Sequence, residues 1–188
     1  MNNRIHATLL SLLTAAWLVG YSINALGTPA AALNAQGILE LKWDDLIPAG
    51  YNPYEILENY NTDSLTDADP KAAELLAKLR EARSMAPVVK ALDGKTVKLP
   101  GFVVPLEHDG EKVSEFLLVP YFGACIHVPP PPANQTVYVV TEEGSATKQE
   151  LFDTVWVTGK LSVKWTGNEL GDAGYTLQAS QVIPYEDE

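Results

Sequence analysis

The sequence contains a single cysteine, Cys125, among its 188 residues. A disulfide bond within the chain is therefore excluded, although exported proteins often depend on such bonds. A lone thiol in an oxidising compartment is exposed to oxidation unless it is buried, bound to an ion or used by a partner. Strong zinc signatures contain two well-spaced pairs of ligands, and the chain has only three histidines to place beside this cysteine.

Basic residues are also scarce. Lysine and arginine together number 13 against 24 aspartates and glutamates, which gives a formal net charge of -11. No run of lysine or arginine reverses this charge locally, so nucleic acid and anionic membrane surfaces are disfavoured as partners. Hydrophobic residues make up 46% of the chain, which is enough to form the core of one ordinary domain.

The N-terminal residues have the pattern of an export signal. Arg4 supplies the positive charge, an apolar stretch follows from Ala7 to Val19, and small residues come next. We predict a signal peptide over residues 1–27, with Gly27 or Ala32 as the residue before cleavage. The apolar stretch is shorter than the roughly 20 residues that span a bilayer, so no membrane span is expected after cleavage.

A helix is predicted over residues 70–84, within an N-terminal extension that covers residues 28–85. Asp69 is placed to cap it, Pro70 occupies its first position, and Pro87 ends it. Before this helix, Leu39–Trp43 is predicted to be extended, and Tyr54–Tyr60 is predicted to form at most two helical turns.

From Val88 onward, β-branched residues alternate in short runs separated by glycine and aspartate turns. These runs predict a mainly β domain over residues 86–188, either a small antiparallel barrel of the oligonucleotide/oligosaccharide-binding (OB) type or a half-open sheet of five to six strands. Asp-Gly pairs at 93–94 and 109–110 predict tight hairpins, and Pro100 and Pro105 predict a bulge or an edge position. The polar segments 141–150 and 166–174 are predicted to be loops. The predicted strands are Val88–Leu92, Thr96–Leu106, Val113–Tyr121, Gln135–Thr141, Thr154–Val163 and Tyr175–Ile183.

The segment FGACIHVPPPPANQ, residues 122–135, combines the cysteine with a nearby histidine and four prolines. If it continues the preceding strand, Cys125 and His127 project to the same face and can share a transition-metal ion, with zinc favoured. Two ligands do not complete a zinc site. His108 is an unsuitable third ligand, because it lies at the hairpin tip, about 30 Å along the strand from Cys125.

Two other interpretations of this segment are open. Cys125 can be a nucleophile activated by His127 and oriented by Asn134 or Gln135, although the spacing matches no local signature of such enzymes. Alternatively, Cys125 is a small buried side chain and the prolines form a stiff connector. Four consecutive prolines fix an extended backbone, which suits a groove for a ligand formed by Pro129, Pro130, Pro131 and Pro132 with Asn134 and Gln135.

The stretches WDDLIP, GFVVPLE, EFLLVPYFGACIHVPPPPANQ and VWVTGKL resemble the family called domain of unknown function 3299 (DUF3299), over roughly residues 38 to 185. The resemblance implies an exported, periplasmic protein of Gram-negative bacteria, often encoded near ABC transporter components of the macrolide-exporter type in systems that respond to zinc. No reaction is established for the family. The positions that match its motif are Cys125, His127, Pro129 to Pro132, Asn134 and Gln135.

Three hypotheses follow. In the first, the chain is a periplasmic accessory protein that binds zinc through Cys125 and His127 and works with an ABC transporter. In the second, it is an interaction module without metal that uses the proline-rich segment. In the third, it is a cysteine-dependent enzyme, which the sequence favours least.

Overall fold

The computed structural model describes residues 37–52, 55, 57, 66, 69–109, 112–127, 130–142 and 148–186. The predicted signal peptide and most of the predicted turns over Tyr54–Tyr60 lie outside these residues. Within the described ranges, no helix is both long and apolar enough to cross a membrane.

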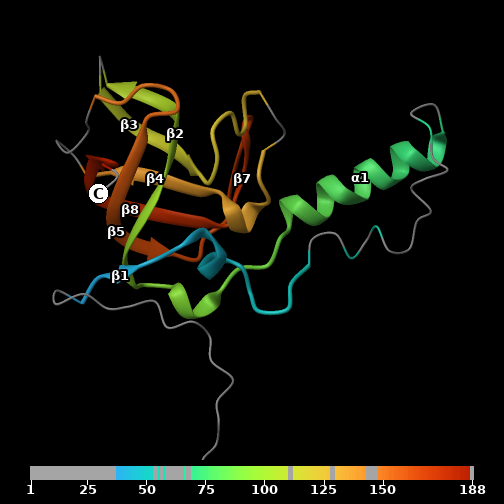
Figure 1. Cartoon of the computed structure of the whole chain (residues 1–188), viewed down its shortest axis with the longest axis horizontal. Coiled ribbons are helices and arrows are strands. Elements are labelled where there is room, and N and C mark those ends of the chain that lie inside the picture. Colours follow the sequence, from blue (N-terminus) through green and yellow to red (C-terminus); the bar gives the residue numbers. More distant parts are fainter. Residues whose placement is uncertain are drawn as a thin grey trace, which may run out of the picture.

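Eight strands are present in the described part of the chain, and five of them close into a barrel (Figure 1). The strands are β1 (Leu39–Glu40), β2 (Thr96–Asp109), β3 (Lys112–Val119), β4 (Val137–Thr141), β5 (Thr154–Ser162), β6 (Thr166–Asn168), β7 (Gly171–Ala173) and β8 (Tyr175–Pro184).

The barrel follows the order β2-β3-β4-β8-β5, and β5 pairs with β2 to close it. Most neighbours are antiparallel, but β4 and β8 run parallel, and the short β1 lies parallel beside the start of β2. The mainly β, OB-like barrel predicted from the alternating runs is therefore confirmed. The hairpin predicted at the second Asp-Gly pair is confirmed as well, because Asp109 pairs with Lys112 across β2 and β3.

β2 pairs with two neighbouring strands, and this allows the sheet to close. Its residues 96–102 pair with β5, and its residues 102–109 pair with β3. The register shifts between Pro105 and Glu107, as the proline predicted, and such a bulge increases the bend of a strand. On β5, Gly159 sits at another register shift, where an added Cβ would come within 2.1 Å of the carbonyl oxygen of Gln178. Only glycine permits this approach between β5 and β8.

The core fills the barrel with alternating side chains from its strands. Fully buried members include Leu99, Phe116, Leu161 and Leu177. Leu41 and Leu46, which precede the helix, belong to the same cluster, so the N-terminal extension contributes to the barrel core. Burying one such leucine stabilises a fold by about 1.5–3 kcal/mol.

The predicted helix is confirmed as α1 (Pro70–Ser84). The carboxylate of Asp69 accepts a hydrogen bond from the backbone nitrogen of Lys71 at 2.8 Å, and Pro70 occupies the first turn. Figure 1 shows α1 projecting from the barrel as an arm, with its C-terminal end nearest to β7.

Several predicted elements are wrong. Val88–Leu92 is not a strand, because its second half closes into a 3₁₀ turn over Lys90–Leu92, in which the backbone nitrogen of Leu92 donates to the carbonyl of Val89. The first Asp-Gly pair therefore links a turn to β2 rather than two strands. The prediction of an extended stretch over Leu39–Trp43 holds for β1 and Lys42 and fails at Trp43, where a 3₁₀ turn begins that spans Trp43–Leu46.

The predicted loop over residues 166–174 is also wrong, because it contains the small hairpin β6–β7. The side-chain oxygen of Asn168 accepts a hydrogen bond from the backbone nitrogen of Leu170 at 2.9 Å and so closes the turn. This hairpin forms a separate two-stranded sheet, which borders the segment that carries Cys125.

Candidate functional site

The segment that carries Cys125 is a tight turn and not a continuation of β3, so that prediction is wrong. β3 ends at Val119. Gly123 and Cys125 both have left-handed backbone angles, with φ of 83° and 68°, and the backbone nitrogen of His127 donates to the carbonyl of Gly123 at 2.9 Å. A left-handed conformation is uncommon for a residue other than glycine. Cys125 and His127 are therefore not alternate residues on one face of a strand.

Cys125 packs inward. It is half-buried against a small apolar cluster that includes Val119, Ala124 and Ala173. A Cβ added to Gly171 of β7 would lie 3.9 Å from the cysteine sulfur, which places the thiol directly beneath this residue. Burial raises the pKa of the Cys125 thiol to about 11. This direction disfavours the thiolate that a nucleophile requires.

His127 lies against Phe152, which is a member of the apolar cluster that Cys125 also contacts. Its side chain is exposed, and its ring centre lies 5.9 Å from that of Phe152. The amides expected to orient the imidazole are used elsewhere: Asn134 donates to the carbonyl oxygen of Pro87 at 2.8 Å, and Gln135 donates to that of Trp43 at 2.7 Å. The arrangement therefore does not fit a cysteine–histidine nucleophile.

The zinc prediction lacks ligands within the chain. Among the described residues, no three histidine, cysteine or acidic side chains gather closely enough to hold a metal ion. The backbone of His108 pairs with Val113 at the tip of the β2–β3 hairpin, whereas Cys125 follows the other end of β3. Cys125 and His127 alone do not fit the four-coordinate shell of a structural zinc ion. Zinc binding stays a prediction.

The turn exposes the apolar side chains of Tyr121, Phe122 and Ile126, and Leu151, which precedes Phe152, is exposed as well. We call these four residues the aromatic turn surface. Phe122 is 67% exposed and Leu151 is 48% exposed. The Phe122 ring lies 4.7 Å from that of the buried Phe152, which anchors it. Such exposed groups are found at interfaces, although single exposed apolar residues are common on any surface.

The proline-rich segment supports α1. Pro129 lies outside the described residues, Pro130 is exposed and Pro131 is buried. The guanidinium of Arg83 donates from Nη2 to the carbonyl oxygen of Pro130 at 2.7 Å. Asn134 and Gln135 join the segment to the chain on either side of the helix, and their predicted role in an interaction stays a prediction.

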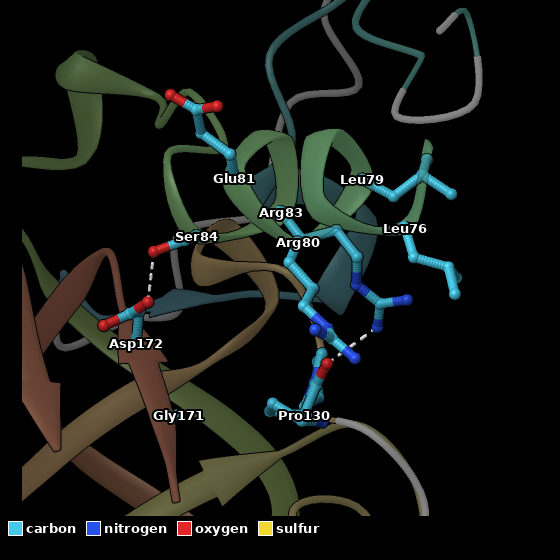
Figure 2. Close-up of a pocket in the computed structure, with 10 residues that line it drawn as sticks. Leu76, Leu79, Arg80, Glu81, Arg83, Ser84, Pro130, Gly171 and Asp172 are labelled. Carbon is cyan, nitrogen blue, oxygen red and sulfur yellow. Dashed lines mark hydrogen bonds between the residues drawn. The ribbon is translucent and has the colours of Figure 1, made fainter. Parts of the chain in front are cut away.

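Between α1 and the proline-rich segment lies a groove of about 570 Å³ (Figure 2). We call it the arm groove. The hydroxyl of Ser84 forms a hydrogen bond with the carboxylate of Asp172, which joins the end of α1 to β7. The lining residues are Leu76, Leu79, Arg80, Glu81, Arg83, Ser84, Pro130, Pro131, Gly171 and Asp172.

Sequence reasoning placed prolines at a possible groove but missed the helix residues that face them. One signal was available, since α1 contains four of the chain's 13 basic residues within 15 positions. No local pattern indicated that Arg83 meets Pro130, because 47 positions separate them.

Comparisons place the chain among known proteins. The profile of a family described as "Protein of unknown function (DUF3299)" matches residues 43–184. A crystal structure of a DUF3299 family protein (PA4066) from Pseudomonas aeruginosa PAO1 is similar, with 46% sequence identity and a TM-score of 0.61, and the match covers 80% of this chain and 98% of that one. No curated protein matches. The chain belongs to the DUF3299 family.

Proposed function

We propose that this chain is an exported accessory protein without catalytic activity, and that its arm groove holds a peptide segment of a partner protein. The resemblance to proteins encoded near ABC transporters of the macrolide-exporter type supplies the expected partner, which is the periplasmic part of a transporter component. The predicted signal peptide supports the periplasmic location.

The arm groove carries this proposal. Its volume of about 570 Å³ lies within the range of ligand sites, about 300–1,000 Å³. One wall is the arm α1, and the other is a proline-rich backbone whose residues lack backbone donors and keep an extended shape. Prolines and leucines offer apolar contact, and arginines offer directed hydrogen bonds. This mixture suits a peptide whose side chains alternate between apolar and polar groups.

Two hydrogen bonds fix the shape of the groove in the free protein. Arg83 bonds to Pro130, and Ser84 bonds to Asp172, so the C-terminal half of α1 is joined to both the proline-rich segment and β7. Pre-formed walls lower the entropy lost on binding. A groove of this kind can bind a short segment without a change of fold.

The test compares two exposed leucines. Leu76 lines the arm groove and is 54% exposed, whereas Leu151 lies outside the groove on the aromatic turn surface. Binding of the purified periplasmic domain of the transporter component is measured by calorimetry with the wild-type chain, with Leu76→Ser and with Leu151→Ser. We expect Leu76→Ser to weaken binding by about five-fold or more, because half a leucine's apolar area leaves the interface.

Leu151→Ser is expected to bind like the wild type. Equal affinity of all three proteins would show that the arm groove is not part of the interface. Weaker binding of Leu151→Ser alone moves the interface to the aromatic turn surface. Absence of binding in all three rejects this transporter domain as the partner.

A further inference from the structure

Two guanidinium groups lie together beside the arm groove. Arg80 and Arg83 project from the same side of α1 toward Pro130, as Figure 2 shows. Arg83 donates to the carbonyl oxygen of Pro130 at 2.7 Å, and Arg80 has no acceptor among the described residues. Each guanidinium has five donors, so most of the donors in this pair are available to a ligand.

No carboxylate of the groove neutralises this pair. Figure 2 shows the side chain of Glu81 pointing away from the two guanidiniums. The Asp172 carboxylate stays charged but bonds to the hydroxyl of Ser84, and Figure 2 shows it apart from the two guanidiniums. Within the described ranges, ion pairs join Lys78 to Glu74 and Lys98 to Glu40, and none involves Arg80 or Arg83.

The charge of the arm is opposite to that of the protein. α1 holds four basic and two acidic side chains and so carries +2, whereas the whole chain carries -11. Two like charges side by side repel each other unless an anion lies between them. A local positive pair on an acidic protein therefore indicates a place for an anionic group of a ligand.

Apolar groups flank the guanidiniums. Leu76 and Leu79 precede them on α1, and Pro130 and Pro131 face them across the groove. A ligand that satisfies both kinds of contact needs an anion next to an apolar group. An anionic membrane has this chemistry too, but the net charge of the chain repels such a surface. A peptide is the occupant that the observations favour.

Building on the proposed function, we infer that the arm groove selects a partner segment in which an acidic side chain lies next to an apolar one. Arg80 and Arg83 bind the carboxylate by charge-assisted hydrogen bonds, and Leu76, Leu79 and the prolines contact the apolar neighbour. The acidic side chain supplies selectivity, because a neutral segment leaves the two guanidiniums without an anion.

The experiment selects random heptapeptides displayed on phage against the wild-type chain. The expected result is enrichment of aspartate or glutamate beside leucine, isoleucine or phenylalanine. A synthetic peptide of the enriched sequence is then compared with its amide version, in which the acid is replaced by asparagine or glutamine. We expect the amide version to bind the wild type about ten-fold more weakly, and to bind Arg80→Gln/Arg83→Gln as well as the acidic peptide does.

A matched control, Lys160→Gln/Lys164→Gln, removes two exposed charges of the same sign, one from β5 and one from the residues that follow it. It should keep the ten-fold preference, and thermal melts of both double variants check folding. Enrichment of neutral peptides whose binding falls in Leu76→Ser overturns the acidic preference and leaves the proposed function intact. Two results would overturn both the acidic preference and the proposed function. One is that the selected peptides bind Leu76→Ser and the arginine variant as tightly as the wild type, and the other is that the selection enriches nothing.

The membrane alternative is tested with phosphatidylglycerol vesicles. We expect the wild type to stay in solution when the vesicles are pelleted. Pelleting of the wild type that is lost in Arg80→Gln/Arg83→Gln but kept in the lysine control overturns the peptide and assigns the site to a lipid headgroup.

Discussion

The side-chain amide of Asn134 donates a hydrogen bond to the carbonyl oxygen of Pro87, which lies 47 positions earlier in the chain. This bond joins the proline-rich segment to the residues that follow α1. Asn134 is 1% exposed, whereas Pro87 is exposed, so the bond is partly shielded from water. The two walls of the arm groove are therefore fixed to each other at their base.

Replacing Asn134 with alanine should lower the free energy of unfolding by about 0.5–1.5 kcal/mol, because the hydrogen bond to the exposed Pro87 is lost. Urea unfolding followed by tryptophan fluorescence measures the change. Gln178→Ala is the control, since Gln178 is exposed on β8. A loss no larger than that of the control would show that the bond contributes little to stability.

Cys125 should react slowly in the folded protein. Burial raises the pKa of its thiol from 9.0 to about 11, so little thiolate is present near neutral pH. At pH 8 we expect iodoacetamide to label Cys125 more slowly in the native chain than in the urea-unfolded chain. Equal rates would mean that the thiol is not protected.

The same shift predicts a pH dependence of stability. Because the pKa is higher in the folded state, the contribution of this thiol is fully present below about pH 9 and is lost as the pH rises through about 11. The wild type should therefore lose more stability between pH 8 and pH 10.5 than Cys125→Ala. Comparison with this variant removes the effects of the tyrosines that also titrate at high pH.

The barrel could be predicted because its signals are local. The alternation over Thr96–Leu106 and Thr154–Val163, and the Asp109–Gly110 turn, each lie within about ten residues. The helix likewise follows from Asp69 and Pro70 at its start. Closure of the sheet then follows from the need to bury one face of every strand.

The candidate site could not be predicted in the same way. The left-handed conformation of Cys125 depends on the packing of its turn against β7, and no neighbouring residue indicates it. The arm groove depends on contacts such as Arg83 with Pro130, which the sequence separates widely. The segment Val88–Leu92 has the composition of a strand, but Lys90 lies in a 3₁₀ turn. The backbone nitrogen of Val89 donates to the hydroxyl of Tyr175, so it is not available for pairing in a sheet.

Tyr175 connects three segments through one hydroxyl group. Its oxygen accepts from the backbone nitrogen of Val89 at 2.7 Å and donates to the carbonyl of Leu46 at 2.8 Å. Tyr175→Phe should therefore destabilise the chain by about 1–3 kcal/mol, because two backbone groups lose a partner. Urea unfolding measures this change. Tyr185→Phe, which alters an exposed tyrosine, should have almost no effect, and equal losses in the two variants would contradict the prediction.

Measuring the metal content of the purified chain tests the zinc hypothesis. The isolated chain, purified without an affinity tag and dialysed, should retain well below one zinc ion per molecule, because no third ligand gathers with Cys125 and His127 among the described residues. Mass spectrometry of the metal in the wild type, Cys125→Ala and His127→Ala measures this directly.

One zinc ion per wild-type chain, lost in either variant, would contradict this prediction. Zinc needs four ligands in a closed structural site, so such a result would require the turn of residues 120–127 to rearrange or a second molecule to supply the rest. Repeating the measurement across a range of protein concentrations distinguishes these cases. A shared site fills only when chains associate, whereas a rearranged turn binds zinc at any dilution.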